Sequence, residues 1–151
     1  MRFGFIVLLL LVFPKSTQAQ FDAKDPMGAV IAFFEAFHKR DLRGLETAFS
    51  KQATLGSTRL DQRGNSQFGT SAISDFITAV VQRPDTPVWE EKLDVDTVLL
   101  DFPMAQIWVA YEFFLDGNFS HCGINNFTLV WQDQRWKIVQ LIDTRHTSCS
   151  E

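Results

Sequence analysis

The sequence predicts an α+β fold in which three helices pack on one face of a curved sheet. Apolar residues recur at helical spacing between residues 26 and 49, and again between residues 73 and 81. After Pro87 the chain reads almost entirely as strand, and Asp116-Gly117 is a strong signal for a tight hairpin turn. Helices followed by a long antiparallel meander are typical of this class.

A secretory signal is expected over residues 1–19. Residues 3–13 are almost wholly apolar and follow Arg2, but this run is much shorter than the roughly 20 residues that span a bilayer as a helix. Thr17-Gln18-Ala19 supplies small residues for cleavage after Ala19. Residues 20–151 then form a single domain in a periplasmic or secreted protein, and a retained membrane anchor is the disfavoured alternative.

Charge and composition exclude several classes of partner. The whole chain has a net charge of −4, and loss of Arg2 and Lys15 with the signal makes it −6. An acidic chain without a basic stripe is unsuited to nucleic acid or to anionic membrane surfaces. The sequence contains neither a glycine-rich phosphate loop nor a serine nucleophile elbow. We therefore expect no cofactor, no nucleic acid, and no membrane contact after signal cleavage.

Cys122 and Cys149 are expected to form a disulfide, because an even pair in an oxidising compartment is usually bonded. Free thiols are one alternative. A zinc site built from these cysteines with His121 and His146 is another. Adjacent strand residues point to opposite faces, so His121 and Cys122 are poorly placed to bind one ion, and no metal is expected.

The helices are placed by their capping residues. Asp25-Pro26 begins the first helix, and Asp41 caps a short second helix whose apolar stripe ends at Phe49. A strand is expected over residues 54–60 and a short one over 67–69. Thr70 or Ser71 then caps the third helix, which ends before Pro84. The remaining strands are expected over residues 88–100, 104–115, 119–131 and 135–146, with a second hairpin turn at residues 133–134.

Two segments carry a resemblance to a known family. Residues 33–41 form a helix followed by an aspartate-capped helix, and Trp136-Lys137-Ile138 opens the closing strand. This ordering resembles the nuclear transport factor 2-like, or SnoaL-like, superfamily over nearly the whole chain after the signal. His121-Cys122-Gly123 and Asp143-Thr144-Arg145 are similar to a secreted bacterial subgroup of unknown function.

The resemblance implies a cone made of three N-terminal helices and a strongly curved mixed, mainly antiparallel sheet. It also implies an apolar pocket inside the cone and a homodimer formed through the outer face of the sheet. Members include ketosteroid isomerase, scytalone dehydratase, limonene epoxide hydrolase, polyketide cyclases and non-catalytic binding domains. The fold alone therefore does not select a function.

Strand pairing suggests a candidate site. If both hairpin turns contain two residues, His121 faces both Glu112 and His146, and Asn125 faces Trp108. In this register Glu112 orients His121 as a general base, and Asn125 polarises a substrate. The alternative is a solvated sheet end whose charges simply pair. A register slip of one residue would exchange the faces.

Asp143 and Arg145 share the other face and are expected to form a structural ion pair. They also loosely resemble limonene epoxide hydrolase, in which an acid–base pair flanks an arginine, but the sequence identifies no second carboxylate. Glu90-Glu91 is expected to be half solvated.

Two functions remain open. The favoured one is a binding domain for a small apolar or aromatic molecule, in a pocket lined by Trp108, Phe127, His146 and Phe34. The alternative is a cofactor-independent acid–base enzyme of the isomerase, cyclase or dehydratase type.

Overall fold

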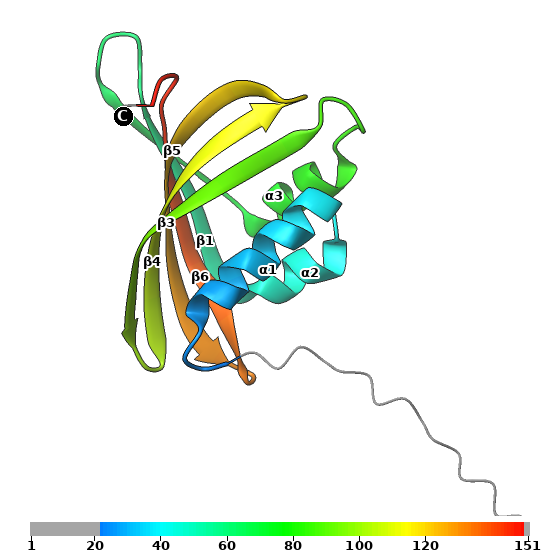
Figure 1. The fold of residues 1–151 in the computed structure, drawn as a ribbon, viewed down its shortest axis with the longest axis vertical. Coiled ribbons are helices and arrows are strands. Elements are labelled where there is room, and N and C mark those ends of the chain that lie inside the picture. The colour runs from blue at the N-terminus through cyan, green and yellow to red at the C-terminus, as the bar shows by residue number, and fades with distance from the viewer. Residues whose placement is uncertain (1–21, 150–151) are drawn as a thin grey trace, which may run out of the picture.

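The computed structural model describes residues 22–149, leaving aside the side chains of residues 95 and 96. The predicted signal lies outside the described residues. The N-terminal half contains α1 (Pro26–Lys39), α2 (Leu42–Ala48), β1 (Phe49–Leu60), β2 (Ser66–Ser71) and α3 (Ile73–Gln82). Four long strands follow (Figure 1): β3 (Trp89–Asp101), β4 (Met104–Leu115), β5 (Asn118–Gln132) and β6 (Arg135–Arg145). None of the helices among these residues combines the length and the apolar character that a membrane-spanning helix requires.

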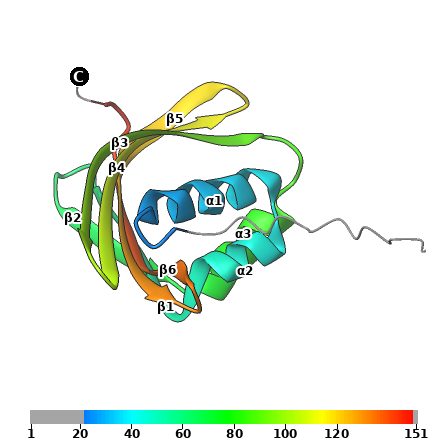
Figure 2. The ribbon, with the colours of Figure 1, turned by 60° about the horizontal axis from the view of Figure 1, so that its bottom comes forward.

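The described strands form one six-stranded sheet in the order β2-β1-β6-β5-β4-β3. The β1–β6 pair is parallel and the other neighbouring pairs are antiparallel. Figure 2 shows that the sheet curves around α1, with α2 and α3 beside it on the same side. The predicted fold class is therefore confirmed, and the concave inner face of the sheet is the face that the helices cover.

Two of the three predicted helix caps are confirmed. Asp25 Oδ1 accepts a hydrogen bond from the Gly28 amide at 3.0 Å, and Asp41 Oδ1 accepts one from Arg43 at 3.1 Å. The predicted cap of the third helix is wrong, because α3 begins after Ala72 without a side-chain cap. Thr70 and Ser71 instead pair with β1 as the end of β2.

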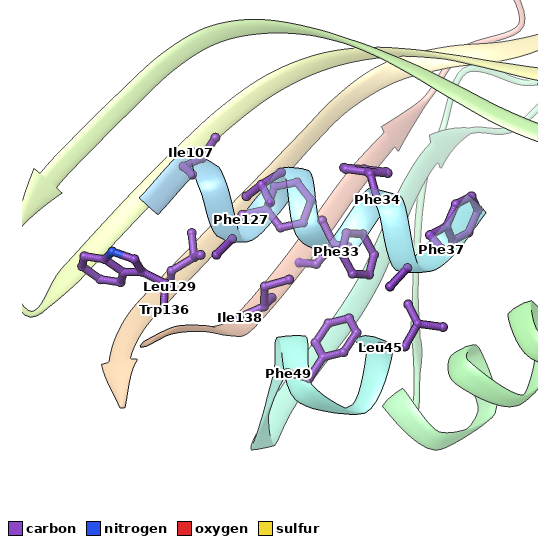
Figure 3. Close-up of a cluster of buried hydrophobic side chains, with 14 of the residues drawn as sticks. Phe33, Phe34, Phe37, Leu45, Phe49, Ile107, Phe127, Leu129, Trp136 and Ile138 are labelled. Carbon is purple, nitrogen blue, oxygen red and sulfur yellow. The ribbon is translucent and has the colours of Figure 1, made fainter. Parts of the chain in front are cut away.

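The core lies between α1 and the inner face of the sheet (Figure 3). Phe33 and Phe34 of α1 pack on Phe127 of β5, with ring centroids 5.9 and 6.0 Å apart. Phe34 is 5% exposed and Phe127 is 0% exposed, and burying each such ring contributes roughly 1.5–3 kcal/mol. These two rings, which are predicted to line a ligand pocket, are therefore part of the packed core. Phe49, expected on the second helix, is the first residue of β1 and joins the same core.

The predicted disulfide is present. Cys122 and Cys149 are bonded, with their Cα atoms 6.0 Å apart and 27 residues of sequence separation. Closing a loop of this length contributes roughly 3–4 kcal/mol on the chain-entropy model. The bond suggests an oxidising, extracellular compartment. Among residues 22–149 no group of three or more His, Cys, Asp or Glu side chains could hold a metal ion.

Candidate functional site

Both predicted hairpin turns contain two residues. Asp116 and Gly117 join β4 to β5, Asp133 and Gln134 join β5 to β6, and all four have positive φ. This backbone is typical of turns whose twist matches that of the flanking strands. Pairing beside each turn also follows the prediction, since Leu115 faces Asn118 and Gln132 faces Arg135.

Further from the turns, two β-bulges shift the register. One leaves Ser120 of β5 without a partner on β4, and the other leaves Val139 of β6 without one on β5. Each bulge inserts one extra residue, so every pair beyond it moves by one position. Consequently Glu112 faces Cys122, His121 faces Phe113, and Asn125 faces Val109 and Asp143. The predicted register is wrong from the bulges onward.

The predicted row of Glu112, His121 and His146 is therefore not formed. Glu112 and His146 both lie next to Cys122 on the convex outer face, whereas His121 lies on the inner face. Glu112 and His146 line an open hollow of about 650 Å³ beside the disulfide, which we call the outer hollow. Trp108 also lies on the outer face and is 44% exposed, so it lines no inner pocket.

On the inner face, polar residues continue the strands beyond the apolar core. Asn125 stands two residues from Phe127, and Asp143 stands two residues from Leu141, so each shares a face with a core residue. We use the name inner polar cluster for the six polar residues gathered there: Glu91, Tyr111, His121, Asn125, Asp143 and Arg145.

Glu91 is a carboxylic acid of this cluster whose pKa is raised. Asn125 Nδ2 donates a hydrogen bond to Glu91 Oε1 at 2.6 Å, and Asn125 is 5% exposed. Burial raises the pKa of Glu91 to about 7, partly offset by the Asn125 hydrogen bond and reinforced by the charge of Asp143. This carboxyl group is therefore about half protonated near neutral pH, and it can either donate or accept a proton.

Tyr111 links β4 to β6 through its hydroxyl group. Its hydroxyl lies 2.9 Å from the Thr144 carbonyl oxygen and 3.2 Å from Asp143 Oδ2. Burial, followed by the charge of Asp143, holds the Tyr111 pKa well above its usual value. The phenol thus stays neutral, and its single hydrogen serves one acceptor at a time.

Asp143 and Arg145 form an ion pair. Arg145 Nε donates to Asp143 Oδ2 at 2.8 Å, and the Asp143 and Arg145 side chains are 12% and 49% exposed. The two residues stand two positions apart on one strand, so they share a face in either register.

His121 packs against two aromatic rings. Its ring centroid lies 4.9 Å from that of Phe113 and 5.7 Å from that of Tyr111, and its Nδ1 lies 3.1 Å from Ser120 Oγ. Burial, followed by the charge of Arg145, lowers the His121 pKa. The imidazole is therefore neutral at pH 7, and Glu112 does not orient it.

His38, at the end of α1, ties the cluster to the helices. His38 Nε2 accepts a hydrogen bond from the Glu91 amide at 3.0 Å. Burial, followed by the charge of Arg83, lowers the His38 pKa, which keeps this nitrogen available as an acceptor. Arg83 in turn lies 5.0 Å from the ring centroids of Phe37 and Trp89.

The sequence alone predicts no functional role for Glu91. The residue as a whole is half-buried, as expected for this pair of glutamates, but its carboxylate points to Asn125 inside the cluster. Trp89 and Leu93 pack against the core, and alternate residues of a strand share a face. The position of Glu91 between them is therefore the feature of the sequence that indicates an inward-facing side chain.

The sequence matches no protein-family model and no curated protein. The structure is similar to that of a nuclear transport factor 2-like protein of unknown function from Shewanella oneidensis MR-1, with a TM-score of 0.62 and 15% identity over 80% of this chain and 97% of that one. A second such protein, from Shewanella baltica OS155, gives a TM-score of 0.58 and 18% identity over 83% and 94% of the two chains.

A ketosteroid isomerase-like protein from Erwinia carotovora atroseptica gives a TM-score of 0.57 and 12% identity, covering 83% of this chain and 97% of that one. The chain therefore has the nuclear transport factor 2-like fold, as the sequence predicts. This fold is compatible with a ligand-binding domain.

Proposed function

We propose that this protein is an exported domain that binds a small, largely apolar molecule whose polar group meets the inner polar cluster. The observation that supports this function is the hydrogen bond between Glu91 and Asn125, two polar side chains placed next to an aromatic core. Ligand sites typically combine apolar surroundings with a few placed polar groups. The Cys122–Cys149 bond and the predicted signal support export.

The aromatic rings around the cluster supply a surface for the apolar part of such a molecule. Trp89 and Phe113 pack edge to face with their centroids 5.8 Å apart, and Phe113 also contacts His121. Both rings are only partly buried, so they retain surface for a ligand. The outer hollow is larger but open, and its Lys92 and Glu112 are exposed to solvent.

Titration with 3-phenylpropan-1-ol, followed by NMR, tests the binding function. We expect saturable shifts at the Asn125 side-chain amide and at the backbone amide of His121. Asn125→Ala should weaken binding about tenfold, since it removes the partner of Glu91 and leaves that carboxyl unsatisfied. Glu112→Gln, on the outer face, should leave the affinity unchanged.

Two results would contradict the proposal. Shifts confined to residues of the outer hollow, such as Glu112 and His146, would move the binding site to the other face of the sheet. Absence of saturable shifts at the inner polar cluster would remove the support for a ligand there.

The inner polar cluster also favours a second candidate, a cofactor-independent acid–base enzyme. Glu91 has a pKa of about 7, while Asp143 is paired with Arg145. Two carboxyl groups in such different environments are typical of acid and base pairs. In this candidate Glu91, rather than His121, is the proton-transferring group, with Tyr111 and Asn125 as donors to the substrate. Glu91 also supplies the second carboxylate that the resemblance to limonene epoxide hydrolase lacked.

We further propose that two copies of the chain pair through the outer face of the sheet. Leu99, Met104 and Trp108 lie on that face and are 59%, 50% and 44% exposed. Exposed apolar side chains gathered on one face are typical of an interface. Native mass spectrometry should show a dimer that Trp108→Asp dissociates, and a monomeric mass for the unsubstituted chain would reject the pairing.

A further inference from the structure

We infer that the molecule bound at the inner polar cluster carries a carboxylate, and that the terminal nitrogens of Arg145 bind it. This inference rests on the proposed binding function, and it specifies the chemical class of the ligand as a small apolar monocarboxylate.

The hydrogen bonds of Arg145 leave one edge of its guanidinium group open. Arg145 Nε donates to Asp143, whereas within the described part of the chain no hydrogen bond involves its two terminal nitrogens. The side chain is 49% exposed. A planar guanidinium with two parallel N–H donors matches the two oxygens of a carboxylate, and this match is the basis of bidentate recognition.

The charges around Arg145 favour an incoming anion. Arg59 of β1 is its register neighbour and adds a second cation. Asp143 of β6 is paired with Arg145, and Tyr111 of β4 is neutral. Burial, followed by the charge of Arg145, lowers the pKa of His121 of β5, which favours its neutral form. Glu91 of β3 is the remaining acid of the cluster, and His38 of α1 contacts its backbone amide.

Glu91 therefore couples binding of a carboxylate to pH. Below pH 7 Glu91 is mostly protonated and carries no charge that repels the ligand. Above pH 7 Glu91 is mostly ionised in the ligand-free protein. A carboxylate bound nearby disfavours this charge, so Glu91 keeps its proton in the ligand-bound protein. Linkage then requires the affinity for the carboxylate to fall as pH rises through about 7, approaching tenfold per pH unit for full coupling.

The rings of Trp89, Phe113 and His121 define where the apolar body of the ligand lies. They belong to neighbouring strands on the face that carries Arg145. A ligand with a ring and a short chain ending in a carboxylate can contact these rings while its charged end meets Arg145.

Two probes that differ only in their polar end test this inference. We would compare 3-phenylpropanoate with 3-phenylpropan-1-ol by calorimetry at pH 6 and pH 8, using the chain that remains after signal cleavage. At pH 6 the carboxylate should bind at least tenfold more tightly than the alcohol. That advantage should shrink at pH 8.

Three variants assign the effect to the guanidinium group. Arg145→Gln should remove the advantage of the carboxylate over the alcohol, because the variant lacks both terminal nitrogens. Arg145→Lys keeps a cation beside Asp143 but loses the two parallel donors, so it should fold and still lose most of the advantage. Arg63→Gln, which removes the same charge from an exposed turn residue, should change neither affinity.

The outcomes separate this inference from the proposed function. Equal binding of both probes to the wild-type chain would overturn the carboxylate inference and leave the binding function standing. Tighter binding of the carboxylate that persists in both Arg145 variants would also overturn it, because another group would then be the anchor. Failure of both probes to bind would count against the proposed function and the inference together.

Discussion

The free energy of unfolding of the wild-type protein should fall by about 3 kcal/mol between pH 4.5 and pH 8, and replacing Glu91 by glutamine should abolish this fall. The Glu91 pKa rises from 4.5 to about 7 on folding. Between these values the folded chain holds a proton that the unfolded chain has lost, so stability falls as pH rises and levels off above pH 7. The glutamine side chain would accept the Asn125 hydrogen bond and would not titrate.

Urea unfolding at pH 5, 6, 7 and 8 measures this difference. Glu90→Gln is the matched control, because it removes the same charge from the exposed neighbour on the other face of β3. Its stability curve should stay parallel to that of the wild type. If the Glu91→Gln curve were also parallel, Glu91 would be an ordinary solvated acid, and the acid–base enzyme would lose its proton-transferring group.

Local signals in the sequence predict much of the fold. Asp25 and Asp41 begin their helices as their side chains predict, because an N-cap needs only the residue itself and the next turn. The two-residue turns follow in the same way. Thr70 and Ser71 illustrate the limit of such signals, since pairing with β1 overrides their capping preference.

The candidate site was predicted less well, because its residues meet across strands. Asp143 and Arg145 stand on one strand, so their pairing does not depend on register. Glu112 and His121 stand on different strands, and the unpaired Ser120 separates them onto opposite faces. A bulge depends on how two strands pair, and the residue types at the bulge give little indication of it. Its shift of one residue nevertheless changes every cross-strand contact beyond it.

Glu91 escaped prediction for a different reason. An acidic residue within a strand usually faces solvent, so composition favours the outward face even where the alternation with Trp89 and Leu93 favours the inward one. The inward position is stable because Asn125 satisfies the carboxyl and the raised pKa lets it stay neutral. The partner of Glu91 thus lies on β5, whose register is shifted by a bulge that the sequence does not predict.

Replacing Gly123 by alanine should lower the free energy of unfolding by roughly 3 kcal/mol or more, since the new side chain has no space. A Cβ atom at this position would lie 1.9 Å from the Thr144 carbonyl oxygen, which is backbone and fixed by its own contacts. The Ile124 amide donates to Thr144 Oγ1 at 2.8 Å, and the Thr144 carbonyl accepts from Tyr111. The close approach of β5 and β6 at Gly123 is therefore what brings Tyr111 and Thr144 together.

Thermal and urea unfolding of Gly123→Ala, compared with Gly69→Ala, test this account. Gly69 lies on β2, where a Cβ atom would meet nothing within 4 Å, so its substitution should change stability by less than about 0.5 kcal/mol. If the two variants were equally stable, the strands would have room to separate at Gly123. The contact between β5 and β6 would then not fix the position of the Tyr111 hydroxyl, and Tyr111 could not position a ligand or a proton at the inner polar cluster.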